Sequence, residues 1–128
     1  MKKILISLLF LVAVLKTEAQ SSVFTVVDSL LFKGNYQKAL ILLEETKDEN
    51  ALVLEKTADI YQTIGNYNKA IASYSEALTI EEKSQLKIKL ANVYATIGYK
   101  NKAIELYEDV FKKDSSNLLV ANNLGKLY

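Results

Sequence analysis

The chain has 128 residues, with 16 lysines, no arginine and 15 acidic residues, giving a formal net charge of +1. Histidine and cysteine are absent, which removes the commonest general base, transition-metal ligand and thiol nucleophile, so we expect no enzyme, no metal site and no cofactor. A nearly neutral chain without arginine also disfavours a nucleic-acid partner, because phosphate binding usually requires a basic stripe.

Residues 1–19 have the pattern of a secretory signal peptide. Two lysines at positions 2 and 3 precede an unbroken apolar run of twelve residues, Ile4 to Leu15, and Ala19 provides a small residue for cleavage. A helix that spans a bilayer needs about 20 apolar residues, so a permanent anchor is the alternative rather than the prediction. We predict cleavage after Ala19 and an exported, periplasmic or otherwise extracytoplasmic mature chain, 20–128, without membrane insertion.

Three nearly identical phrases follow, and they predict the turns of helical hairpins. They read Gly-Asn-Tyr-Gln-Lys-Ala at 34–39, Gly-Asn-Tyr-Asn-Lys-Ala at 65–70 and Gly-Tyr-Lys-Asn-Lys-Ala at 98–103. Repetition at a period of about 34 residues in helical segments indicates stacked hairpins. Glycine readily adopts the left-handed conformation past a helix end, so we interpret the four glycines as turn residues: Gly34, Gly65, Gly98 and Gly125.

The hydrophobic pattern predicts two helices in each repeat. In the second repeat, Asn50 caps a helix from Ala51 to about Ile64, and another helix runs from about Tyr67 to Ile80. The third repeat has helices from Ser84 to Ile97 and from about Lys100 to Lys113, and a capping cluster at 114–117 opens the next helix. The predicted repeats are therefore about 21–50, 51–83 and 84–117, with a partial fourth at 118–128.

Residues at spacings of three and four predict the core of this stack. Small residues let the two helix axes of a hairpin approach closely, and tyrosines fill the space beside them. We interpret the following as structural positions of the repeats: Ala39, Ala58, Tyr61, Ala70, Tyr74, Ala77, Ala91, Tyr94, Ala103, Tyr107, Leu124 and Tyr128. The tyrosines could alternatively form a stacking platform for bases or sugars, but their period matches the core positions.

The patterns Ala70-x-x-x-Tyr74, Ala103-x-x-x-Tyr107 and Leu124-Gly125-x-x-Tyr128, with the recurring Gly-Asn-Tyr turn, resemble the tetratricopeptide repeat (TPR) over about residues 21–128. The resemblance implies an all-α, right-handed superhelical solenoid of antiparallel helix-turn-helix units. It also implies a protein-binding function with no chemistry of its own. The chain departs from the family pattern because Glu82 and Ser115 stand where a proline usually opens the next repeat.

In this family the first helices of the repeats line a concave groove that commonly receives a partner's extended peptide or helix. We expect these groove residues to bind peptide: Asp28, Glu55, Asp59, Gln62, Gln85, Asn92 and Asn122. The acidic residues should favour a basic segment and the amides should bind a peptide backbone, although a merely solvated helix face is the alternative for each residue. Because we expect Asp59 to be exposed, its replacement by lysine should weaken binding without lowering stability.

Some grooves of this family hold a partner's terminal carboxylate through lysine, arginine and asparagine. The corresponding places here carry Glu55, Asp59 and Ile88, so a clamp for chaperone tails is disfavoured.

The last predicted helix carries an apolar side with no following helix to cover it: Leu118, Leu119, Val120, Leu124, Leu127 and Tyr128. A longer repeat protein, a second copy of the chain or a different protein could cover this side, so self-association through 118–128 is one expectation. Two functional hypotheses follow. The chain is an exported scaffold or adaptor that binds a protein or peptide, or it is the extracytoplasmic sensing or tethering segment of a larger signalling protein or enzyme.

Overall fold

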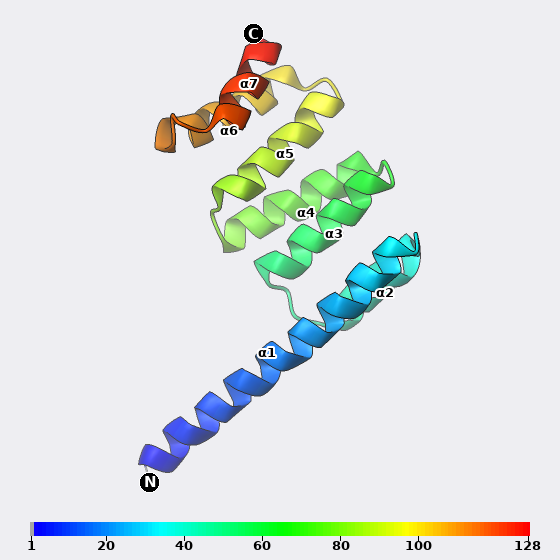
Figure 1. Ribbon diagram of the computed structural model, residues 1–128, viewed down its shortest axis with the longest axis vertical. Coiled ribbons are helices and arrows are strands. Elements are labelled where there is room, and N and C mark those ends of the chain that lie inside the picture. Colours follow the sequence, from blue (N-terminus) through cyan, green and yellow to red (C-terminus); the bar gives the residue numbers. More distant parts are fainter. Residues whose placement is uncertain (1) are drawn as a thin grey trace. The chain divides into compact units, whose positions relative to one another are not determined.

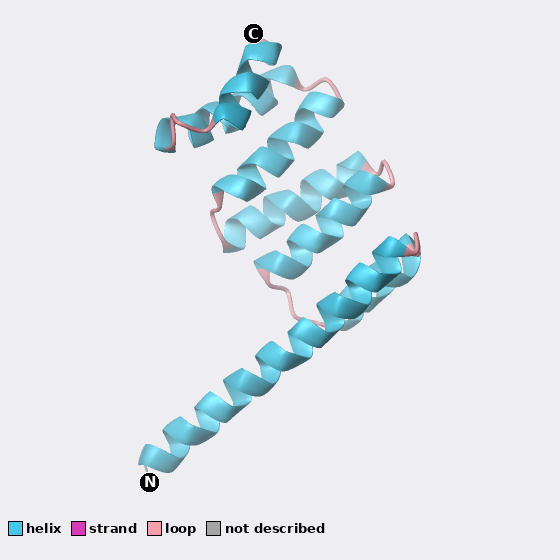
Figure 2. Ribbon diagram, viewed as in Figure 1, coloured by secondary structure: helices cyan, strands magenta, loops and turns pink. Residues whose placement is uncertain are grey.

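The computed structural model describes residues 2–128, apart from the side chains at positions 16 and 17, and this part is helical without strands (Figures 1 and 2). The described residues form seven helices joined by short turns. They form two compact units, Met1–Lys47 and Asp48–Tyr128, which are described separately below.

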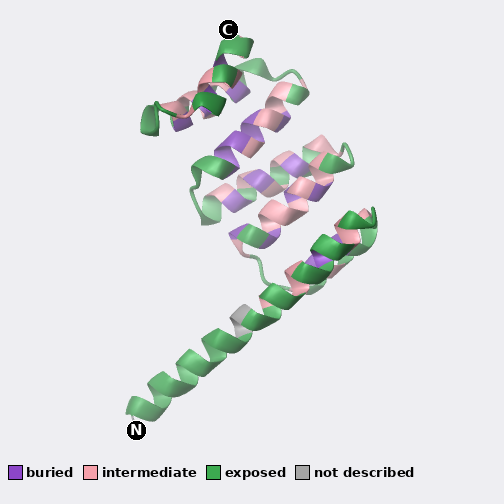
Figure 3. Ribbon diagram, in the orientation of Figure 1, coloured by how far each residue is buried: buried purple, intermediate pink, exposed green. Residues whose placement is uncertain are grey.

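The first unit is a hairpin of α1 (Lys2–Phe32) and α2 (Tyr36–Glu45), and α2 runs back along the C-terminal part of α1 (Figure 1). The sequence predicted a helix beginning near residue 21, whereas α1 continues without a break from the apolar leader into the repeat. Among the described residues, α1 is the one helix long and apolar enough to cross a membrane, a property that signal sequences share. The apolar residues of its leader are exposed in this unit (Figure 3).

The second unit contains two complete hairpins and one further helix, packed consecutively along the chain (Figure 1). Its elements are α3 (Ala51–Thr63), α4 (Tyr67–Ile80), α5 (Ser84–Thr96), α6 (Lys100–Lys113) and α7 (Leu118–Leu127). These bounds agree to within one residue with the helices for which both ends were predicted. Asn50 caps α3 as expected, because its Oδ1 accepts the N–H of Val53 at 2.9 Å, and Asn117 Oδ1 accepts the N–H of Val120 at 3.2 Å to cap α7.

Three of the four glycines occupy the hairpin turns. Gly34, Gly65 and Gly98 have φ angles of +75°, +79° and +87°, a conformation that side chains with a Cβ rarely adopt. The interpretation of Gly125 as a turn residue is wrong, because it lies inside α7 with no positive φ. Gly125 corresponds to a position inside the first helix of the other repeats, not to one of their turns.

The core of the second unit consists of two clusters, each centred on a buried tyrosine. One contains Ala58, Ala70, Tyr74, Ala77, Leu86, Leu90 and Val93, with Tyr61 and Tyr94 packed partly buried against it. The other contains Ile88, Ala91, Ala103, Tyr107, Val110, Val120 and Leu124. Small residues therefore lie at the helix contacts as predicted, and Ala39 is buried in the same way in the first unit.

The apolar side of α7 is smaller than the sequence indicated. Val120 and Leu124 belong to the core, while Leu118 and Leu119 are exposed. Tyr128, interpreted as a core position, is 73% exposed, and its hydroxyl donates to the carboxylate of Glu108. The difference arises because α7 packs chiefly on α6 within the second unit, whereas α5 packs against both α4 and α6.

Candidate peptide-binding face

Two of the predicted groove residues form an acidic pair that is already neutralised in part by the next repeat. Glu55 and Asp59 lie one turn apart on α3, and the ammonium of Lys89 on α5 reaches both. Its Nζ donates to Glu55 Oε1 at 2.7 Å and to the two oxygens of Asp59 at 2.8 and 2.9 Å. Burial alone would lower the pKa of Lys89, but its hydrogen bonds to Asp59 and Glu55 outweigh burial and raise the pKa above the ordinary value.

A tyrosine from the second helix of the hairpin completes this cluster. Tyr74 on α4 has no exposed surface, and its hydroxyl donates to Asp59 Oδ1, with Gln62 Oε1 a further acceptor at 3.0 Å. Burial, together with the carboxylate of Asp59, raises the pKa of Tyr74 far above its usual range. The structure therefore brings Glu55, Asp59 and Gln62 together around the hydroxyl of Tyr74 and the ammonium of Lys89, which the sequence did not connect with them.

The third repeat contains the equivalent tyrosine hydrogen bond, with an amide as the acceptor in place of a carboxylate. Asn92 Oδ1 accepts the hydroxyl of Tyr107 on α6, and burial raises the pKa of this tyrosine also. Both pairs have a separation of 15 residues, Asp59 to Tyr74 and Asn92 to Tyr107. That shared spacing was visible in the repeats and could have indicated a hydrogen bond across each hairpin.

We call the polar side of α3, α5 and α7 the first-helix face, defined by Glu55, Asp59, Gln62, Gln85, Asn92 and Asn122. Gln85 on α5 and Asn122 on α7 are exposed, whereas the other four are half-buried. Asp28, the remaining predicted residue, is exposed on α1 in the first unit. The expectation that Asp59 is exposed is wrong, because its carboxylate is half-buried and hydrogen-bonded by Tyr74 and Lys89.

The electrostatics of this face differ from the sequence expectation. Two carboxylates share one ammonium in the Glu55, Asp59 and Lys89 cluster, so one negative charge is left instead of two. Its attraction for a basic segment is correspondingly weaker than the sequence suggested. The groups on this face that remain open to a partner are chiefly the amides of Gln85 and Asn122.

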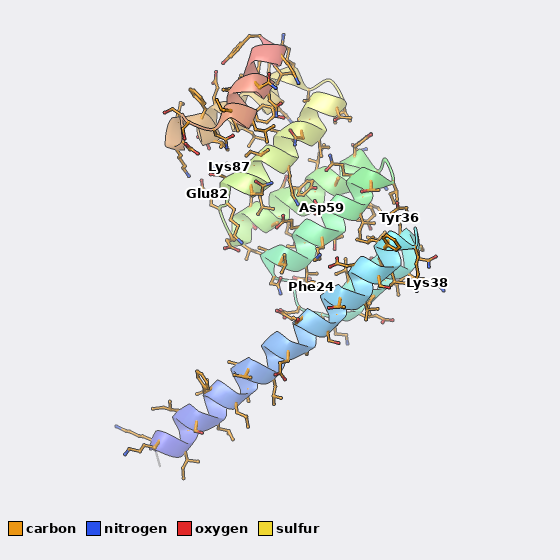
Figure 4. All side chains as sticks on the ribbon, viewed as in Figure 1. Phe24, Tyr36, Lys38, Asp59, Glu82 and Lys87 are labelled. Carbon is orange, nitrogen blue, oxygen red and sulfur yellow. The ribbon has the colours of Figure 1, made fainter. Side chains whose placement is uncertain are left out.

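A second ion cluster joins α5 to α6 and does not belong to this face. Lys87 is 8% exposed, and its Nζ lies 2.6 Å from Glu82 Oε1 and 2.6 Å from Asp109 Oδ2 (Figure 4). These hydrogen bonds, first to Asp109 and then to Glu82, raise the pKa of Lys87, and Lys87 in turn lowers the pKa of both carboxyl groups. Because all three partners satisfy one another, we interpret the cluster as a structural link.

Nothing in residues 2–128 provides a metal centre. No group of three or more histidine, cysteine, aspartate or glutamate side chains in this range could hold a metal ion.

The same fold occurs in many solved structures, of which 137 chains match. A TPR protein from Parabacteroides merdae has a TM-score of 0.78 at 19% identity, and the match covers 84% of this chain and 45% of that one. The second TPR domain of human RPAP3, in complex with an HSP70 peptide, has a TM-score of 0.72 at 20% identity and covers 82% and 91%. The first TPR of Spaghetti (RPAP3), bound to an HSP90 peptide, has a TM-score of 0.72 at 16% identity and covers 82% and 86%.

The stacked hairpins, the glycine turns and these similarities define a tetratricopeptide-repeat protein. Within that class, the chain belongs to the family described as soluble NSF attachment protein (SNAP), whose model matches residues 12–128. No curated protein matches the chain. It spans less than half of the Parabacteroides merdae protein.

Proposed function

We propose that this chain is an exported, non-enzymatic scaffold that binds a peptide or protein segment on its first-helix face. The observation that carries the proposal is the pair of exposed amides, Gln85 and Asn122, presented by the first helices of successive repeats. Side-chain amides both donate and accept, so they suit the backbone of an extended peptide. The two RPAP3 domains with peptides bound, and the family description as an attachment protein, support a binding role.

The partner segment should carry little charge. Lys89 neutralises much of the acidic pair on α3, so a strongly basic segment gains little there. An acidic tail is also disfavoured, because Glu55, Asp59 and Ile88 stand where the family would need cationic or amide side chains to hold a carboxylate. We therefore expect a neutral, extended segment.

Peptide selection from a random library, followed by fluorescence anisotropy on the selected peptides, tests this function. The double variant Gln85→Ala/Asn122→Ala should weaken binding by about tenfold, because it removes two amides from the contact. Asn101→Ala is the matched control, since Asn101 is an exposed amide on α6, outside the first-helix face. Equal loss in both variants, or loss in neither, would move the binding site elsewhere.

Export is the second part of the proposal, and the phase of the repeats supports it. The helices α3 and α5 each contain 13 residues, and the 31-residue offset between Gly34 and Gly65 maps Ala51 onto Gln20. Cleavage after Ala19 would thus leave 20–32, a first helix of that same length. N-terminal sequencing of the chain from the periplasm of a bacterial host should read Gln-Ser-Ser, and an intact Met-Lys-Lys terminus in the membrane fraction would refute cleavage.

A second candidate function is a sensing or tethering segment of a larger signalling protein or enzyme. The observation that favours it is the continuity of α1, which would connect an uncleaved apolar leader to the first repeat without a flexible linker. The same sequencing experiment separates the two functions.

A further inference from the structure

A hollow of about 560 Å³ lies between two successive hairpin turns of the second unit. We call it the turn-edge hollow, and its walls come from the α3–α4 turn and the α5–α6 turn: Ile64, Gly65, Asn66, Tyr67, Asn68, Ile97 and Tyr99. None of these residues belongs to the first-helix face. Its volume lies within the range of about 300 to 1,000 Å³ that is common for ligand sites.

The walls combine apolar surface with uncharged polar groups. Ile64 is 45% exposed and Tyr99 is 57% exposed, so both offer apolar area to a partner. The ring of Tyr99 is held in place by an edge contact with Tyr94 at 6.1 Å between centroids and by the ammonium of Lys102 at 5.7 Å. No charged residue lines the hollow, so its walls do not select for a charged ligand.

The polar side chains of the hollow offer several hydrogen-bond donors. Asn66 Oδ1 is occupied, because it accepts the N–H of Lys69 at 3.3 Å and caps α4, and this leaves the NH₂ of Asn66 to donate outward. The hydroxyls of Tyr67 and Tyr99 and the side-chain amide of Asn68, which also line the hollow, are able to donate as well. A ligand that fits should therefore present acceptors next to apolar rings.

We propose that the turn-edge hollow binds an uncharged, proline-rich peptide segment in the polyproline II conformation. Such a segment has no internal hydrogen bonds, its carbonyls point outward as acceptors, and proline has no N–H that would need an acceptor. Aromatic side chains commonly bind these segments because the preformed helix loses little entropy on docking. The hollow supplies both requirements, with tyrosine rings for the prolines and donors for the carbonyls.

A neutral carbohydrate is the competing ligand, because sugars also stack on tyrosine. Sugar hydroxyls donate as well as accept, however, so a sugar would depend on the acceptors of the hollow that the capping bond of Asn66 leaves open, whereas a proline-rich segment needs only donors. Ile64 and Ile97 moreover add branched aliphatic surface, which suits pyrrolidine rings better than a polar sugar edge. These two features favour the peptide.

The test is fluorescence anisotropy with a fluorescein-labelled polyproline peptide of about ten residues and the full chain in mild detergent. We expect saturable binding with a Kd on the order of 100 μM, since the hollow is shallow and contains few anchors. Tyr99→Ala should weaken binding about tenfold or more, and Ile64→Ser should weaken it from the opposite turn. Tyr128→Ala is the matched control, an exposed tyrosine outside the hollow that should change the Kd by less than about twofold.

The outcomes separate this site from the first-helix face. The Gln85→Ala/Asn122→Ala variant should bind polyproline as the unchanged chain does, so failure of one proposal leaves the other testable. Absence of saturation below about 2 mM peptide, or an unchanged Kd in both Tyr99→Ala and Ile64→Ser, would overturn the proposal. Tighter saturable binding of maltohexaose than of the peptide would also overturn it, in favour of a sugar site.

Discussion

The hydroxyl of Tyr74 offers a direct measure of how firmly the second repeat is held together. Tyr74→Phe removes only this hydroxyl from a side chain with no exposed surface, and it leaves the ring packing in place. A hydrogen bond to a charged group contributes about 1.5 to 3 kcal/mol. Lys89 still neutralises Asp59 in the variant and water reaches its half-buried carboxylate, so we expect a loss near the lower limit, about 1.5 kcal/mol.

This loss should be visible in thermal and urea unfolding followed by circular dichroism. For a domain of about 80 residues, each kcal/mol lowers the Tm by roughly 4 to 8 °C, so Tyr74→Phe should lower it by about 6 to 12 °C. Tyr128→Phe is the control, because its hydrogen bond to Glu108 is at the exposed surface, and it should leave the Tm within about 2 °C of the unchanged chain.

A double-mutant cycle identifies the acceptor. If Asp59 is the main partner, Tyr74→Phe and Asp59→Asn should be coupled by about 1 kcal/mol, because each change removes part of the same hydrogen bond. A Tyr74→Phe variant as stable as the unchanged chain, or additive effects of the two changes, would refute the reasoning that this hydrogen bond stabilises the repeat.

Two further predictions concern the glycines and the buried lysine. Gly65→Ala should lower the free energy of unfolding in urea by about 1 kcal/mol because Gly65 has a positive φ, although nothing lies within 4 Å of an added Cβ. Gly125→Ala in α7 should raise the free energy of unfolding by up to about 1 kcal/mol. Effects of the same sign in both variants would contradict this prediction. Lys87→Met should flatten the acid limb of a Tm-against-pH profile. The carboxyl groups paired with Lys87 have lowered pKa values, so their contribution to stability is complete above the ordinary carboxyl pKa and is lost as the pH falls below about 4. An unchanged acid limb in the variant would show that the ion cluster contributes nothing to stability.

The helices and their turns could be predicted because their signals are local. A cap such as Asn50 and a glycine such as Gly65 act on the residues beside them, and the spacing of alanines and tyrosines assigns the buried sides. Gly125 was misplaced because glycine also occurs inside helices, and only its phase in the repeat, not its residue type, distinguishes the two cases.

The candidate face was harder to predict because its contacts cross between elements. Lys89 and Asp59 are 30 residues apart, and their ion pair depends on how α5 packs beside α3. The sequence identified Asp59 as polar and placed it on the correct helix, but it could not show that a tyrosine and a lysine already satisfy the carboxylate. The role of this face in peptide binding remains a prediction.

The paired tyrosines also give each complete hairpin of the second unit its own optical reporter. The chain has eight tyrosines and no tryptophan, so its near-ultraviolet absorption and emission come from tyrosine. Tyr74 donates to a carboxylate and Tyr107 to an amide, so the two phenols sit in chemically different surroundings and differ in how strongly their acceptors perturb the excited ring. Opening of either hairpin breaks one of these two hydrogen bonds and therefore changes the tyrosine signal, so unfolding of the second unit can be followed without any attached label.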